Sequence, residues 1–164
     1  MNFTRHISRR LDAEHRSNLE LLGRLETALA HGQHRPDAKP GDFAKLIGNL
    51  VYALEQDVTR HFEFEERELF PRLRAAGEDG IANLLAQEHD TIRAVAAELL
   101  PLARAVLSGP ADKAMFEQFK RTALEMVERQ VAHIQKETMG LLPMLEDLLD
   151  DETDRALDFN YASS

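Results

Sequence analysis

Apolar side chains recur every three or four residues in four long blocks, and clusters of glycine and proline separate these blocks. Such spacing places one apolar stripe along each of four helices, and no strand pattern competes with it. The blocks extend over about residues 4–30, 42–75, 81–107 and 111–149. Because the connections are short, neighbouring helices should be antiparallel. The sequence therefore predicts an all-α fold, an up-down-up-down antiparallel four-helix bundle.

The apolar stripes also predict where the bundle ends. We expect one domain over residues 1–149 and an acidic C-terminal tail over residues 150–164, which is either mobile or a short capping helix. Pro101 should kink or interrupt the third helix, and Pro143 should bend the end of the fourth. In that last helix the stripe predicts that Met144 and Leu148 face inward.

The composition excludes several classes of site and partner. The chain has no cysteine, so any metal ion must be held by nitrogen and oxygen atoms. A net charge of -9 argues against a nucleic-acid partner, which requires a clustered basic surface. No run approaches the roughly 20 apolar residues that span a membrane, so we expect no membrane association and a cytoplasmic protein.

Six ionisable side chains occupy inward positions where leucine would be expected: His15, His61, Glu65, His89, His133 and Glu137. Such groups are costly to bury unless a partner replaces their hydration. In two cases a glutamate follows a histidine by four residues, a spacing that places both side chains on one helix face. Counting from the centres of the predicted loops puts all six at a similar depth. They therefore predict a metal site, although any one of these histidines alone would usually be a hydrogen-bonded core residue.

The neighbouring polar residues are expected to have lesser roles. Asp57 or Gln130 could hydrogen-bond the far ring nitrogen of a histidine ligand and orient the ring. The glutamates beside His61 are expected to be solvated or to lie outside the ligand shell: Glu63, Glu66 and Glu68. The remaining histidines are expected at the surface: His6, His31 and His34.

The segments around the six residues resemble the haemerythrin-like, or HHE cation-binding, family: LDAEHRSN, HFEFEERELFP, AQEHDTIR and HIQKE. The resemblance covers about residues 12–148. It implies a haemerythrin-like bundle around a non-haem di-iron centre, with the four histidines as terminal ligands and Glu65 and Glu137 as bridges. Oxygen-carrying members have a further histidine where this chain has Leu85 or Arg93, and an aspartate at the position of Thr138. The closer resemblance is therefore to the HHE subgroup, which is linked with responses to oxygen, iron, nitric oxide or peroxide.

The resemblance implies two iron ions as cofactors, with an oxo or hydroxo bridge, because six side chains leave coordination positions free. Histidine and carboxylate ligands also suit manganese or zinc. Three functions stay open: binding or sensing dioxygen, nitric oxide or iron; a di-iron enzyme that consumes peroxide or oxidises iron; and a metal-free helical interaction module. A buried apolar wall favours a small diatomic ligand or peroxide over a large substrate: Leu22, Leu54, Ile92 and Met126. No catalytic residue, protein partner or oligomeric state is predicted.

Overall fold

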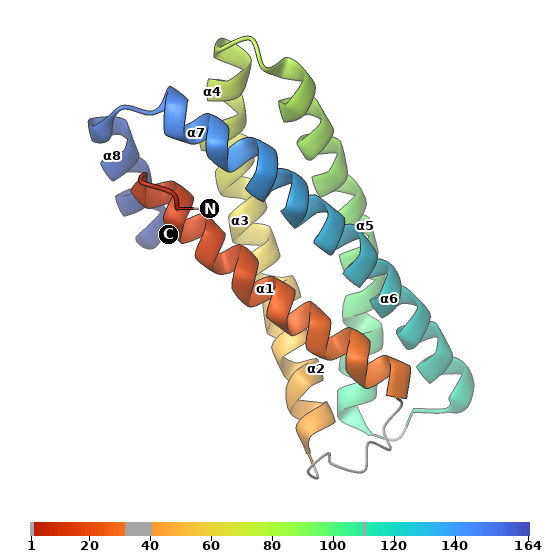
Figure 1. Cartoon of the computed structure of the whole chain (residues 1–164). Helices are drawn as coiled ribbons and strands as arrows, with labels where there is room; N and C mark the ends of the chain where they lie inside the picture. The colour runs from red at the N-terminus through yellow and green to blue at the C-terminus, as the bar shows by residue number, and fades with distance from the viewer. Residues whose placement is uncertain (1, 32–40, 110) are drawn as a thin grey trace.

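The computed structural model describes residues 2–31, 41–109 and 111–164, and these residues form five continuous helices without a strand (Figure 1). The first helix is α1 (His6–His31). The second joins α2 (Asp42–Tyr52), η1 (Ala53–Asp57), α3 (Val58–Phe64), η2 (Glu65–Leu69) and α4 (Phe70–Ala75), where η marks a π-helical turn. The third is α5 (Asp79–Ser108). The fourth joins α6 (Lys113–Lys136), η3 (Glu137–Leu141) and α7 (Leu142–Leu148), and the fifth is α8 (Asp151–Ala162).

The first four helices form a closed ring. In it α1 packs against α2 and α6, while α5 packs against α2 and α6. Successive helices run in opposite directions, as Figure 1 shows. The prediction of an all-α, up-down-up-down bundle is therefore confirmed. The predicted break at 31–41 lies almost wholly outside the described residues, and so does His34; the side chain of His31 is also outside them.

The interior contains two apolar clusters that share the helices but occupy different ends of the bundle. One cluster includes Leu25, Leu50 and Phe119, towards the α1–α2 end. The other includes Leu73, Leu85 and Leu145, towards the α4–α5 turn. The four apolar residues predicted to line the metal site are all buried in the first cluster: Leu22, Leu54, Ile92 and Met126. Between the two clusters the buried positions belong to polar side chains.

Two of the π-helical turns begin at predicted ligands and end two residues before a proline. Glu65 begins η2 and Pro71 follows it, while Glu137 begins η3 and Pro143 follows it. The N–H of the residue before each proline donates to the carbonyl of that glutamate, five residues earlier. Proline cannot donate the hydrogen bond that would continue the α-helix, which favours this wider turn.

The wider turn changes which residues face inward after Glu137. A π-helical turn inserts one residue into the helix, so the inward stripe moves by one position. The prediction that Leu148 faces inward is wrong, because Leu145 and Leu149 take the buried places; Met144 is partly buried and packs against the second cluster. Leu148 is 40% exposed, whereas Leu145 is fully buried.

Pro101 does not interrupt its helix, contrary to one of the two outcomes expected from the sequence. It lies inside α5, which continues to Ser108. The carbonyl that loses its hydrogen bond belongs to Ala97, and both residues are on the exposed side of the helix. Water can satisfy that carbonyl, so the helix tolerates the proline.

The turn between α4 and α5 depends on Gly77. The N–H of Glu78 donates to the Leu73 carbonyl at 2.9 Å, and the N–H of Gly77 donates to the Arg74 carbonyl at 3.0 Å. This pair of hydrogen bonds is the Schellman motif, which needs a left-handed residue between the two ends. Gly77 supplies it with a φ of 87°.

Replacing Gly77 with alanine should lower the free energy of unfolding by about 1 kcal/mol, because a Cβ disfavours the left-handed backbone. A Cβ at this position would meet no other atom within 4 Å, so the cost is conformational only. Gly48 is the matched control: it lies inside α2 and is equally free of neighbours. Gly48→Ala should raise the free energy of unfolding by about 1 kcal/mol. Urea denaturation measures both, and two changes of the same sign would contradict the explanation.

The acidic C-terminal segment is helical, one of the two alternatives expected for it. Figure 1 shows α8 beside the start of α1, with both chain termini at this side of the bundle. Its inward residues Leu157 and Tyr161 are buried in the second apolar cluster. None of the helices in the described part of the chain has the length and apolar character needed to cross a membrane.

Candidate metal centre

The six residues predicted as ligands form one buried polar layer between the two apolar clusters. The structure brings all six side chains together, and their exposed fractions range from 0% to 5%. They come from α1, α3, η2, α5, α6 and η3, so every helix of the four-helix ring contributes. Their ligand atoms form two groups of four, and Glu65 and Glu137 belong to both groups.

The first group, here called the first position, consists of His15, His61, Glu65 and Glu137. Nε2 of His15 lies 2.9 Å from Oε2 of Glu137 and 3.3 Å from Nε2 of His61. Nε2 of His61 lies 2.9 Å from Oε1 of Glu65. Two imidazole nitrogens and one oxygen from each carboxylate therefore converge on one point.

The second position consists of His89, His133, Glu65 and Glu137. Nε2 of His89 lies 3.2 Å from Oε2 of Glu65 and 3.4 Å from Oε1 of Glu137. Nε2 of His133 lies 2.6 Å from Oε1 of Glu137. Each carboxylate thus presents one oxygen to each position, which is the arrangement that two bridging carboxylates require.

The separations between these donor atoms fit shared metal ions. Donors about 2.1 Å from one ion and at right angles to each other lie about 3.0 Å apart. Both oxygens of Glu65 and Nε2 of His133 are buried, and within the described part of the protein they have no hydrogen bond of regular geometry, only close contacts with other members of the six. Buried polar atoms are rarely left without a regular hydrogen bond, and a cation at each position would give them a partner. The residues therefore fit a pair of metal ions.

The hydrogen bonds of the Nδ1 atoms, which point away from the polar layer, show which ring nitrogen of each histidine can bind a metal ion. Nδ1 of His61 is 3.0 Å from Glu14, that of His89 is 2.8 Å from Glu66, and that of His133 is 2.8 Å from Glu88. An ionised carboxylate only accepts hydrogen bonds, so these Nδ1 atoms carry the proton. In a neutral ring the lone pair is then on Nε2, which faces the centre. Such carboxylate partners orient ligand histidines and increase their basicity.

These partners differ from those predicted. Gln130 is buried, but Glu88 occupies the Nδ1 position of His133. The side chain of Asp57 lies outside the described residues. The carboxylate that contacts Nδ1 of His61 belongs to Glu14. Nδ1 of His15 has the hydroxyl of Thr138 at 3.0 Å.

A repeated pattern in the sequence could have indicated these partners. The bridging glutamates lie in His-x3-Glu-x5-Pro at 61–71 and again at 133–143, and a Glu-His pair precedes each segment, at 14–15 and at 88–89. The glutamate of each Glu-His pair contacts the histidine of the segment that follows it. The residue after each bridging glutamate contacts the histidine of the other pair. The bundle thus has two similar halves around the polar layer.

Without a metal ion, the charges in the layer balance through protons on the rings. Burial lowers the pKa of His89, but hydrogen bonds with Glu137 and Glu65 outweigh it and raise the pKa to about 9. The pKa values of His61 and His133 are also raised, because the nearby carboxylates outweigh burial. Burial opposes ionisation of Glu137, yet the charge of His133 and the histidine hydrogen bonds hold its pKa well below the usual value. At neutral pH, without a metal ion, the rings of His61, His89 and His133 therefore carry a second proton, and the Glu137 carboxylate is ionised beside them.

Metal binding should therefore release protons, since only neutral imidazole binds a metal ion. A raised pKa means that the proton is bound at neutral pH and lost as the pH rises through the raised value. Zinc affinity should increase with pH at least up to about pH 9, the pKa of His89. Calorimetric titration with zinc at pH 7, in buffers of different ionisation enthalpy, should show release of roughly one to three protons per chain. Binding without proton release at pH 7 would contradict this account.

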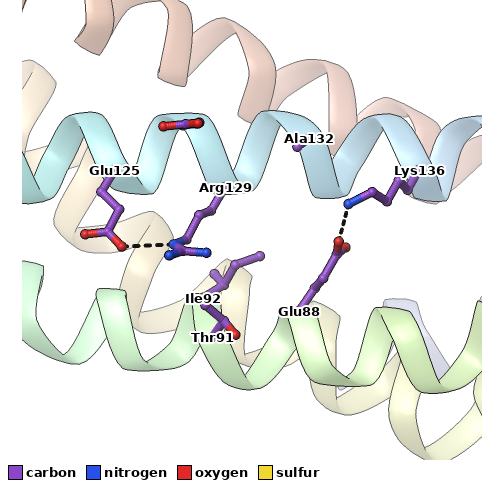
Figure 2. A pocket seen from close by; sticks show the side chains of 8 residues that line it. Glu88, Thr91, Ile92, Glu125, Arg129, Ala132 and Lys136 are labelled. Atoms are coloured by element: carbon purple, nitrogen blue, oxygen red, sulfur yellow. Dashed lines mark hydrogen bonds and ion pairs between the residues drawn. The ribbon is translucent and has the colours of Figure 1, made fainter.

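A surface groove lies next to the second position, between α5 and α6. Its volume is about 480 Å³, and all eight of its lining residues are outside the set of six. Figure 2 shows Glu88 reaching from α5 to Lys136 on α6, while Glu125 pairs with Arg129 along the groove. Because Glu88 also contacts His133, the groove meets the partner of a predicted ligand and stops short of the ligand itself.

Comparison with known proteins agrees with the chemistry of the polar layer. Over residues 6–145 the chain matches the family described as Hemerythrin HHE cation binding domain. No curated protein was found to match the chain. The matched region contains all six predicted ligands and ends before α8 begins.

Proposed function

The chain belongs to the hemerythrin HHE cation-binding family, and we propose that it is a di-iron protein that binds or senses a small ligand such as dioxygen, nitric oxide or iron. One observation carries the proposal: four Nε2 atoms converge on two carboxylates, and each carboxylate has one oxygen at either position. A bound pair of iron ions would supply redox chemistry and coordination positions for an exogenous ligand. The choice of iron over manganese, zinc or cobalt rests on the family resemblance, because the donor set suits all of them.

The protein residues have three tasks in this proposal. The histidines and the two glutamates hold the ions, while Glu14, Glu66 and Glu88 fix the ring orientations. The apolar clusters on either side exclude bulk water from the layer. With the six donor side chains at most 5% exposed, a diatomic molecule or peroxide suits the site better than a large substrate.

Metal analysis tests the first part of the proposal. Protein purified without chelator should contain about two iron ions per chain, one for each position. A protein without stoichiometric iron, manganese or zinc, and unable to bind them, would instead be a helical interaction module.

Mixing the anaerobic, ferrous protein with each ligand tests the second part. A sensing protein should give a stable spectral change with dioxygen or nitric oxide that is complete after one equivalent. The alternative is an enzyme that consumes peroxide or oxidises iron, for which turnover at a steady rate would be seen. As a control, Glu128→Gln alters an exposed residue of α6, so its reaction with each ligand should equal that of the unchanged protein. Steady consumption of peroxide would reject the sensing proposal.

A further inference from the structure

The C-terminal helix α8 lies outside the region that matches the family, yet it is anchored to the bundle by specific contacts. The Asp154 carboxylate is 4% exposed and accepts hydrogen bonds from the backbone N–H groups of His6 and Ile7, at 2.8 and 3.0 Å. A carboxylate there also complements the positive end of the α1 dipole. Arg10 of α1 pairs with Asp158 through two hydrogen bonds. These contacts hold α8 in one place against α1.

That placement delivers Tyr161 to the partner of a predicted ligand. Tyr161 is 1% exposed, and its hydroxyl donates to Oε2 of Glu14 at 2.5 Å. The same oxygen accepts from Nδ1 of His61 at 3.0 Å. The guanidinium of Arg60 lies 4.4 Å from the centre of the Tyr161 ring and donates to the Tyr161 carbonyl at 2.9 Å. A continuous chain of contacts thus connects α8 to Nε2 of His61 at the first position.

The equivalent contact at the second position does not involve α8. There Nδ1 of His133 contacts one oxygen of Glu88, and the ammonium group of Lys136 donates to the other oxygen. Lys136 lies in α6, close to His133 itself. Nδ1 of His89 is held by Glu66, which Arg93 of α5 pairs with. The outer contacts of the second position therefore come from the bundle, while those of the first position include a separate helix.

We propose that Tyr161 is a positioning residue for the first metal position, so that docking of α8 and occupancy of that position are energetically coupled. This inference rests on the proposed metal-binding function. With the ring of His61 held by a bound ion, Glu14 is fixed and offers the Tyr161 hydroxyl a preorganised acceptor. With the ion removed, the ring of His61 is held by hydrogen bonds and ion pairs alone, so in this proposal Glu14 and the Tyr161 contact are held less firmly. Because such coupling is reciprocal, weakening the contact of α8 must weaken binding at the first position by the same factor.

Hydrogen exchange of the full-length protein, measured with and without zinc, tests the coupling. Zinc is used because it is redox-inactive and suits histidine and carboxylate donors. In the unchanged protein zinc should slow amide exchange in α8, residues 151–162, by about tenfold, in addition to slowing exchange in the bundle. In Tyr161→Phe the additional slowing in α8 should disappear while that in α5 and α6 persists. Zinc affinity should fall roughly 3- to 10-fold for one of the two ions and stay unchanged for the other.

The control removes the hydroxyl group of the other tyrosine. The chain has two tyrosines, and Tyr52 is 62% exposed on α2, so Tyr52→Phe should behave as the unchanged protein. Zinc-dependent protection of α5 and α6 with no change in α8 would overturn the inference but leave the proposed function intact. Equal loss of affinity for both ions in Tyr161→Phe would also overturn it. Failure of zinc and iron to bind anywhere would reject both proposals together.

Discussion

Removing the bound metal ions should lower the melting temperature of the protein by about 10 °C. A ligand that binds only the folded state at a thousand times its dissociation constant stabilises that state by about 4 kcal/mol. In a domain of this size each kcal/mol shifts the melting temperature by roughly 2–4 °C. The structure supports an effect of this order because both bridging candidates are buried, Glu65 at 0% and Glu137 at 1% exposed, and without metal the charge of Glu137 is compensated by protonated histidines.

Calorimetry of metal-loaded and chelator-treated protein measures the shift. His6→Ala provides the control, since His6 is an exposed histidine outside both positions. It should retain the full difference between the two forms. If loaded and stripped protein melted at the same temperature, metal ions would be bound at the periphery and the buried layer would have a different role.

Replacing Glu137 with glutamine should weaken binding at both positions by at least about 100-fold, because this carboxylate has an oxygen at each. Glutamine preserves the size of the side chain, so the bundle should remain folded, yet its amide nitrogen cannot bind a cation. Glu65→Gln should act in the same way, since Glu65 also contributes to both positions. His15→Ala should instead weaken only the first position, to which His15 belongs.

Zinc or cobalt titration followed by elemental analysis distinguishes these patterns. Glu63→Gln is the control: Glu63 is exposed on α3, two residues from Glu65, and this variant should bind both ions normally. If Glu137→Gln lost one ion and kept the other at full affinity, Glu137 would be a terminal ligand rather than a bridge. Circular dichroism of each variant confirms that the helices persist.

Much of the bundle and the proximity of the candidate ligands follow from local patterns. The three-and-four spacing of apolar residues depends only on helix geometry, so it predicts the four helices and their inward faces up to Glu137. The depth of His15, His61, His89 and His133 follows from counting residues along antiparallel helices. The six side chains do come together, and their role as ligands remains a prediction that the variants above test.

Local patterns did not predict which residues face inward after Glu137, nor which glutamates contact the Nδ1 atoms of the histidines. The inward stripe moves to Leu145 and Leu149 because one extra residue is accommodated in η3, which regular helix periodicity cannot anticipate. Glu14 and Glu88 each precede a predicted ligand in sequence, on the flank of the helix, and each contacts a histidine of another helix. Periodicity classifies such flanking positions as solvent-facing.

The sequence by itself determined that the protein is a helical bundle with six donor side chains on inward faces, because helix periodicity and residue chemistry act within a few turns of the chain. Only the tertiary structure decided which carboxylate oxygen faces which histidine, which glutamate orients each ring, and that Tyr161 of α8 reaches Glu14. Contacts between residues more than 40 positions apart depend on the crossing of separate helices. The side chains across such a crossing are selected by three-dimensional packing, which no local spacing records.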